Sequence, residues 1–271
     1  MSMKSIGMRR ATYSILILVT TLSFSAASLA QFGTGQPTNL QAHEDGPAPA
    51  RDLSGVWTRI RPEGVFRSGS TWTPEPPKLT EWGQAKLATS KDSNAGGFSL
   101  GETNDPVLTR CYPPGVPRIY FHPYPFEIVY TARETIMLYE YDHTIRRVYT
   151  DGRPNPDDPV MLWLGNSVGH WEDDTTFVVT TVGIDERTWL DRSGYQHSDQ
   201  LHVTEVFRRI DNLNLELDIT MEDPVALTEP WVAETLYYRL APPHWELSEI
   251  SCSGDYLDFS SFESFLEEGG E

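Results

Sequence analysis

Two strands and the turn between them can be recognised in residues 202–221, HVTEVFRRIDNLNLELDITM. In the second half, Leu213, Leu215, Leu217 and Ile219 alternate with polar residues, which is the period of a strand with one face buried. The pair Asp211-Asn212 suits a hairpin turn between the two halves. The stretch therefore predicts an antiparallel hairpin, with strands over 202–210 and 213–221.

Further strand patterns lie on both sides of this hairpin. We expect strands over 126–131, 135–149, 167–171, 175–182, 233–240 and a last short one over 246–251. Consecutive strands with short links indicate an antiparallel meander, and closure into a barrel removes its exposed edges. The predicted fold class is therefore mainly β, an antiparallel meander barrel.

The segment before the barrel strands is predicted to wrap the barrel, and a short helix is predicted to follow them. Residues 61–120 carry scattered prolines, which cannot donate to a strand ladder, so they predict a long irregular wrap. One helix is expected over 80–88, with Thr80 as its N-cap. A short C-terminal helix is expected over 256–266, because Phe259, Phe262 and Phe265 or Leu266 recur at helical spacing.

The N-terminus has the pattern of a secretory signal. Lys4, Arg9 and Arg10 precede a short apolar run, and Ser28 and Ala30 provide the small residues that a signal peptidase requires. We expect a signal peptide over 1–30, a flexible lead-in over 31–51 and a single barrel domain over 52–271; the alternative is an uncleaved anchor. The predicted location is periplasmic or secreted.

Charge and cysteine content restrict the partners and the compartment. Removing residues 1–30 takes away three cations and no acids, so the formal charge changes from −18 to −21. Such a charge disfavours nucleic acid and anionic lipid as partners. The two cysteines, Cys111 and Cys252, predict one disulfide in an oxidising compartment.

Several motifs resemble those of known exported proteins. Gly55-Val56-Trp57 resembles the G-x-W signature of lipocalins and other calycins. Residues 105–118, 165–175, 189–191 and 197–205 are similar to a widespread group of exported bacterial proteins of unknown function, from which His170 departs. The resemblance implies a lipocalin-like barrel and carries no activity with it.

The expected strand over 135–149 supplies the first candidate site. Period two places Tyr139, Tyr141, His143 and Arg147 on one face, and the 202–210 strand adds Glu205 among apolar neighbours. These residues are the candidate lining of a barrel pocket, with His143 or Glu205 as a base. The alternative is a structural ion pair between Arg147 and Glu205 that needs no ligand.

Two other places contain candidate residues. Asp191 and His197 could form an acid–base dyad at the pocket mouth, or Asp191 could simply cap a turn through Gly194. Arg118 lies among aromatic residues that either grip a ring-bearing ligand or pack the wrap. His143, His197 and Glu205 form a loose set of metal ligands, but we predict no metal and no cofactor, since neither a metal motif nor a phosphate-binding loop is present.

These residues support two hypotheses of different classes. The first is an exported, lipocalin-like protein that binds a small hydrophobic or aromatic ligand in the barrel. The second is a cofactor-independent acid–base enzyme, an isomerase, lyase or cyclase, that acts on such a ligand in the same pocket. A third, an interaction protein that uses its acidic face, has no apolar stripe or repeat to support it. No pattern indicates an oligomeric state.

Overall fold

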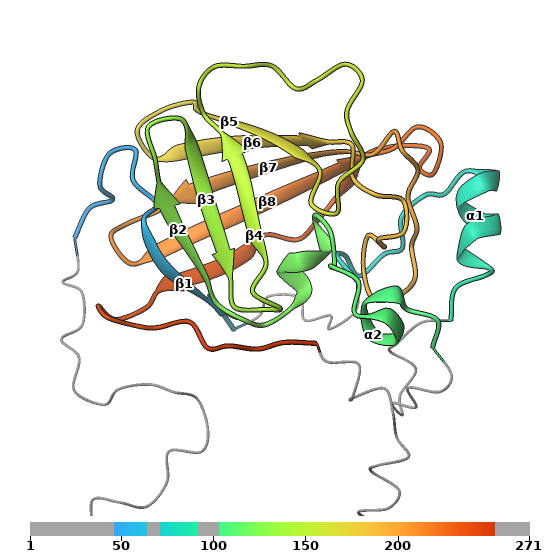
Figure 1. Cartoon of the computed structure of the whole chain (residues 1–271), viewed down its shortest axis with the longest axis horizontal. Helices are drawn as coiled ribbons and strands as arrows, with labels where there is room; N and C mark the ends of the chain where they lie inside the picture. Colours follow the sequence, from blue (N-terminus) through green and yellow to red (C-terminus); the bar gives the residue numbers. More distant parts are fainter. Residues whose placement is uncertain (1–45, 64–70, 92–102, 253–271) are drawn as a thin grey trace, which may run out of the picture. The chain divides into compact units, whose positions relative to one another are not determined.

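A computed structural model describes residues 46–63, 71–91 and 103–252 of the chain (Figure 1). Nine of its strands close into a barrel, because β10 pairs with both β1 and β8, and β9 is added alongside β8. The strands are β1 Gly55–Ile60, β2 Phe126–Tyr130, β3 Glu134–Tyr139, β4 Ile145–Tyr149, β5 Asn166–Trp171, β6 Thr176–Val182, β7 His202–Arg209, β8 Asn214–Glu222, β9 Trp231–Val232 and β10 Leu236–Leu240. The predicted mainly β barrel is confirmed, whereas its identity as a lipocalin is not.

The hairpin of β7 and β8 forms as its sequence predicts. Glu205 lies opposite Ile219 in an antiparallel ladder, and the alternating apolar residues of both strands are buried. Asp211 fixes the turn, since its carboxylate accepts hydrogen bonds from the backbone N–H groups of Leu213 at 2.7 Å and Asn214 at 2.8 Å.

The prediction of one strand over 135–149 is wrong. The chain turns at residues 140–144, where Asp142 and His143 have φ angles of 53° and 48°, and β3 then pairs with β4. The turn shifts the alternation by one residue, so Arg146 and Val148 point into the barrel in place of Arg147. No Gly or Pro marks this turn, and the strand-forming residues on both sides conceal it.

Two other details of the predicted meander differ in the structure. The pairing of β4 with β5 is parallel, because residues 150–165 carry the chain back along the barrel before β5 begins. The strand expected over 246–251 is reduced to one bridge between Ile250 and Tyr141. The sheet is therefore antiparallel everywhere among the described strands except at the β4–β5 pair.

Large side chains fill the centre of the barrel. The rings of Tyr120 and Tyr139 lie 5.9 Å apart, and those of Tyr120 and Phe126 lie 6.1 Å apart, both edge to face. The core also includes Trp57, Ile128, Met137, Val148, Phe177, Val179, Val203, Phe207, Leu215, Leu217, Ile219 and Tyr238. Because these side chains pack against one another, a candidate ligand site has to be sought beyond the barrel centre.

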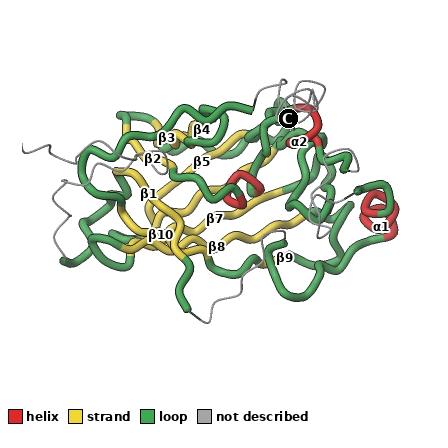
Figure 2. Tube along the Cα trace, turned by 90° about the horizontal axis from the view of Figure 1, so that it is seen from below, coloured by secondary structure: helices red, strands yellow, loops and turns green. Residues whose placement is uncertain are grey.

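The wrap and its short helices gather at one end of the barrel (Figure 1, Figure 2). They are α1 Glu81–Leu87, α2 Pro106–Arg110 and the 3-10 helix η1 Arg118–Phe121. The predicted N-cap of α1 is confirmed, because the Thr80 hydroxyl accepts a hydrogen bond from the Gly83 N–H at 3.1 Å. Trp72 holds this part of the wrap in place. Its ring packs on Phe121 with a separation of 3.9 Å, and its indole N–H donates to the Leu190 carbonyl.

The predicted disulfide joins Cys111 to Cys252. It links the end of α2 to the C-terminal segment, which lies along the β3–β4 turn. The Asp142 N–H donates to the Ile250 carbonyl at 2.8 Å, and the Ser248 N–H donates to the Glu140 carboxylate at 2.8 Å. The disulfide and these hydrogen bonds together fix the wrap against the barrel.

The predicted signal peptide, most of the predicted lead-in and the predicted C-terminal helix lie outside the described residues. The domain boundaries at residues 30, 51 and 52 stay predictions. Within the described ranges, none of the helices has the length and hydropathy that a membrane span requires.

Candidate functional site

A hydrogen-bonded network lies at the centre of the barrel around Arg146 and Glu205. The two form a bidentate ion pair, with Nη1–Oε1 at 2.7 Å and Nη2–Oε2 at 2.5 Å. The Tyr120 hydroxyl donates to Glu205 at 2.6 Å and accepts from Arg146 at 2.9 Å and from Tyr139 at 3.1 Å. Burial and the Glu205 charge raise the pKa of Tyr120 well above its usual value, so its hydroxyl keeps its proton.

This network is saturated. The remaining N–H groups of Arg146 donate to the Ser167 hydroxyl at 3.1 and 3.2 Å and to the Thr181 hydroxyl at 2.8 Å. A buried carboxylate was expected to require an arginine, and it has one, but the prediction that Arg147 is the partner is wrong. Arg147 lies outside the barrel with 59 % of its side chain exposed and pairs with Glu134.

His143 is also outside the pocket that the sequence predicted. It lies in the exposed β3–β4 turn, because the two left-handed residues at 142 and 143 direct the chain back on itself. The prediction that His143 shares a face with Tyr139 is therefore wrong. Tyr139 itself is buried and belongs to the saturated network.

A second polar cluster lies at the wrapped end of the barrel around Arg118, the first residue of η1. Arg118 is 1 % exposed, and its Nη2 donates to the carboxylate of Asp105, the N-cap residue of α2. Its Nε and Nη1 atoms are buried and have no hydrogen-bond partner among the described residues. The Trp189 ring lies 5.7 Å from the guanidinium and forms one wall of the cluster.

His122 follows directly after η1 and contributes another buried nitrogen. Its ring stacks on Tyr141 with a separation of 3.9 Å and an angle of 16°. The ring of Tyr124 also stacks on Tyr141, at 5.7 Å. Nε2 of His122 has no hydrogen-bond partner in the described part of the chain. Burial, helped by the charges of Arg118 and Arg192, lowers the pKa of His122 to about 3, so the ring is neutral at physiological pH.

Asp191 is the second acidic residue of this cluster, after Asp105. It is 0 % exposed, and its Oδ1 accepts hydrogen bonds from the backbone N–H groups of Ser193 at 2.9 Å and Tyr195 at 3.4 Å. Burial raises the pKa of Asp191 to about 7, against smaller lowering effects of the Thr71 hydroxyl, these amides and Arg118. Asp191 is thus an acid poised near neutral pH, and the Arg118 charge acts on Asp191, His122 and Tyr141 alike.

The local chain path explains how the cluster is built. Gly115 adopts φ +75° and lies so close to Thr188 that a Cβ atom would approach it to 2.8 Å. This contact allows the segment before η1 to pass under the loop that carries Trp189 and Asp191. Apart from Tyr141, the site therefore depends on two stretches about 70 residues apart in sequence, residues 105–122 and 188–195.

The predicted dyad of Asp191 and His197 is not formed. His197 is buried, but its Nε2 bonds to the Thr188 hydroxyl at 2.8 Å and its Nδ1 to the Ser198 carbonyl at 2.8 Å. Both ring nitrogens are therefore occupied without Asp191. Burial lowers the pKa of His197, which fits a structural role in the loop.

Of the eight residues that sequence reasoning selected, the structure brings Arg118, Tyr141 and Asp191 to this cluster. Glu205 and Tyr139 lie in the barrel-centre network, and the other three are elsewhere. His122 was not selected as a site residue, although its place among aromatic residues beside Arg118 was a usable signal. No pattern pointed to Arg146, because its inward orientation depends on the turn at 140–144.

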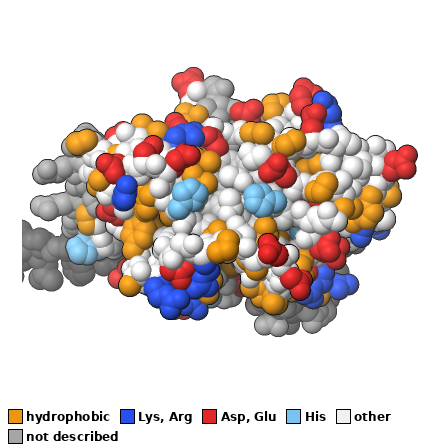
Figure 3. Space-filling model, turned by 90° about the horizontal axis from the view of Figure 1, so that it is seen from above, with side chains coloured by type: hydrophobic (Ala, Val, Ile, Leu, Met, Phe, Trp, Pro, Cys, Tyr) orange, Lys and Arg blue, Asp and Glu red, His pale blue; other side chains and the backbone are white. Residues whose placement is uncertain are grey.

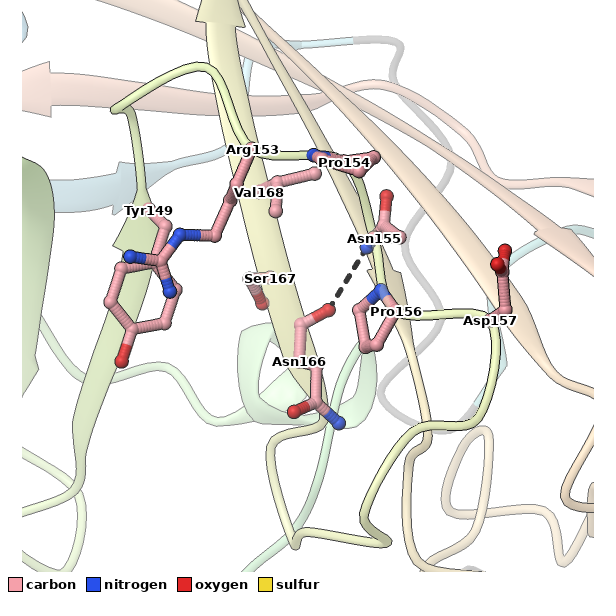
Figure 4. Close-up of a pocket in the computed structure, with 9 residues that line it drawn as sticks. All are labelled: Tyr149, Arg153, Pro154, Asn155, Pro156, Asp157, Asn166, Ser167 and Val168. Atoms are coloured by element: carbon pink, nitrogen blue, oxygen red, sulfur yellow. Dashed lines mark hydrogen bonds between the residues drawn. The ribbon is translucent and has the colours of Figure 1, made fainter.

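A pocket of about 320 Å³ lies on the outside of the barrel beside the β4–β5 pair (Figure 4). Two of its polar side chains have partners: Arg153 pairs with Asp151 and stacks on Tyr149 at 3.9 Å, and Asn155 donates to the Asn166 carbonyl at 3.2 Å. The lining is completed by Pro154, Pro156, Asp157, Ser167 and Val168. Arg153 uses both Nε and Nη2 on Asp151, whereas Arg118 keeps two buried nitrogens without a partner among the described residues, so this pocket is the weaker candidate.

The fold and the cluster together define a mainly β barrel protein with a buried polar site at its wrapped end. Comparison with protein-family models, curated proteins and solved structures gave no match for this chain. In the described ranges, no group of three or more His, Cys, Asp or Glu side chains is placed to hold a metal ion.

Proposed function

We propose that this protein is an exported barrel that binds a small aromatic molecule with a neutral carbonyl oxygen at the Arg118 cluster. The observation that carries the proposal is the pair of buried, unpartnered nitrogens, Nε and Nη1, on Arg118. A buried donor without a partner costs about 1–3 kcal/mol, and more when the group is charged. A ligand oxygen that accepts a hydrogen bond from either nitrogen would recover part of that free energy.

Charge balance favours a neutral ligand over an anion. Arg118 is already neutralised by Asp105, so a carboxylate ligand would bring a second negative charge beside Asp105 and a third beside Asp191. A carbonyl oxygen accepts the same hydrogen bonds without this repulsion. The ring of the ligand would pack against Trp189, whose ring lies 5.7 Å from the guanidinium, beside the stacked pair of His122 and Tyr141.

The polar atoms of the cluster are buried in this structure, so ligand entry requires a covering side chain to move. We infer that the protein works outside the cytoplasm, since the disulfide and the signal-like N-terminus both favour an oxidising compartment. Its strongly acidic chain supports small molecules rather than nucleic acid or anionic membranes as partners. The face in Figure 3 has hydrophobic side chains scattered among charged ones, which does not favour a large protein interface there.

The test is calorimetric titration of the disulfide-bonded protein with acetophenone, with ethylbenzene as the probe that lacks the oxygen and benzoate as the anionic probe. We expect acetophenone to bind more tightly than either. Arg118→Lys keeps a cation beside Asp105 but removes Nε and Nη1, so it should lose at least about tenfold in affinity, the equivalent of one hydrogen bond.

The matched control is Arg147→Lys, which makes the same change in an exposed arginine paired with Glu134. It should leave acetophenone binding unchanged. Equal affinity for acetophenone and ethylbenzene, or equal loss in the two variants, would contradict the proposal.

A further inference from the structure

The Arg118 cluster contains a carboxylate that no cation neutralises directly. Among the described residues Asp191 makes no ion pair, although it is fully buried and lies within the field of Arg118. Two backbone amides hold one of its oxygens, so the side chain has a fixed orientation. A buried carboxylate without a counter-ion is costly in a folded protein, and such groups are more frequent at functional sites than elsewhere.

We propose that this site catalyses proton transfer at the carbon next to the carbonyl group of its ligand, with Asp191 as the base and Arg118 as the group that binds the oxygen. This inference rests on the proposed function, because the substrate is the neutral aromatic carbonyl compound proposed above. The C–H bond breaks and its proton moves to the Asp191 carboxylate. The electron pair of that bond forms a C=C bond, and the π pair of the carbonyl moves onto the oxygen.

The proton then returns from Asp191 to a neighbouring carbon, which isomerises the ligand, or it is replaced on Asp191 by a hydrogen from solvent water that returns to the same carbon, which is exchange. The overall reaction is exchange or isomerisation, and it consumes no oxidant, reductant or second substrate. The negative charge moves from Asp191 to the ligand oxygen, so the total charge of the buried site does not change. The Arg118 N–H group that binds the oxygen, on Nε or on Nη1, stabilises it most strongly when it carries the charge, which is the requirement for catalysis.

The other residues of the cluster have supporting roles. Asp105 is a positioning residue, because it holds the guanidinium through Nη2 and leaves the other nitrogens for the ligand. His122 provides a neutral ring whose Nε2 is available to a second polar group of the substrate. A pKa near 7 keeps Asp191 partly ionised at neutral pH, as a general base needs.

The experiment follows the C1 protons of 2-tetralone, a neutral ketone in which these protons lie between the carbonyl and the ring. Their loss in D₂O is measured by proton NMR with the disulfide-bonded protein and in buffer alone. We expect a rate above that of buffer, proportional to protein concentration, with a rise around pH 7. Asp191→Asn should lower the protein-dependent rate by about 100-fold or more, the usual size of a general-base effect, without loss of 2-tetralone binding.

The control is Asp199→Asn, which alters an exposed acid in the same loop and should leave the rate unchanged. Arg118→Lys should lower both binding and exchange. If 2-tetralone binds but exchange does not exceed the buffer rate, or if Asp191→Asn exchanges as fast as the unaltered protein, the catalytic inference is wrong and the binding proposal stands. Absence of 2-tetralone binding would overturn both.

Discussion

Arg118 and Arg146 are two arginines with the same exposure of 1 % and different hydrogen bonding. Arg146 donates to Glu205, Tyr120, Ser167 and Thr181, and it has no unpartnered nitrogen. Arg118 has one carboxylate partner and two nitrogens without any among the described residues. A saturated buried pair holds the barrel together, whereas an unsaturated one is available to a ligand.

Removing one partner of the central pair should therefore be far more damaging than removing both. We expect Glu205→Leu to lower the free energy of unfolding by about 3–5 kcal/mol, because it leaves the Arg146 charge buried and unpaired. The double variant Arg146→Met with Glu205→Leu should recover most of this loss. Urea denaturation measures both. The control is Glu134→Leu, which removes the partner of the exposed Arg147 and should change stability by less than about 1 kcal/mol.

A second residue-level prediction concerns Asp191 and pH. Its pKa is about 7 in the folded state against 3.8 as the ordinary value, so between these pH values the folded state holds a proton that the unfolded state has released. Stability from this group is present below pH 4 and is lost as the pH rises through 7. Asp191→Asn should therefore be more stable than the unaltered protein at pH 8, by roughly 2–4 kcal/mol.

The difference between the two proteins should shrink towards zero near pH 4, because both side chains are then neutral. Thermal unfolding of both proteins between pH 4 and pH 8 gives a curve of stability against pH for each. Subtracting the two curves cancels the opposite contributions of His122 and His197, whose lowered pKa values reduce stability as the pH falls. A variant that is less stable at pH 8 would contradict the pKa assigned to Asp191.

At the scale of elements, the turn at residues 140–144 decides which side chains enter the barrel. Period-two alternation predicted β7 and β8 well, and the Thr80 N-cap predicted α1, because each is defined by its own local pattern. The same reasoning failed across 135–149, where a turn without Gly or Pro shifts the register by one. As a result Arg147 was expected in the position that Arg146 occupies.

His143→Gly tests this assignment of the turn. Glycine adopts the observed φ of 48° without strain, which offsets its extra entropy in the unfolded chain. We expect stability to change by less than about 1 kcal/mol and acetophenone binding to be unaffected. A large loss of binding would show that His143 belongs to the ligand site.

The candidate site shows where prediction from sequence ends. Arg118 was selected from its aromatic neighbours, Tyr141 from the alternation of the expected 135–149 strand and Asp191 from its loop position. Nothing local indicated that they meet. Their proximity depends on how the wrap folds over the barrel end, and the wrap has no periodicity from which to infer its path. For the same reason α2 and η1 were not predicted.

At the scale of the whole molecule, the Cys111–Cys252 disulfide links residues 141 positions apart. It connects the C-terminal segment to α2, whose N-cap residue Asp105 pairs with Arg118. Loop-closure entropy for so long a separation corresponds to about 5 kcal/mol, and measured losses are typically 2–5 kcal/mol. The double variant Cys111→Ser with Cys252→Ser should lose that amount in urea denaturation.

The same variant should also bind acetophenone more weakly, because without the disulfide α2 no longer holds Asp105 in a fixed position beside Arg118. Equal stability with and without the disulfide would contradict its role in fixing the wrap.

The most direct test of the central claim is nitrogen-15 NMR of the arginine Nε–H groups during titration with acetophenone. Arg118 and Arg146 should each give a signal protected from exchange, assigned with the Arg118→Lys variant. We predict a saturable shift of the Arg118 signal with no change in that of Arg146, whose Nε is already bonded to Ser167. An unchanged Arg118 signal at saturating acetophenone would contradict the proposed site.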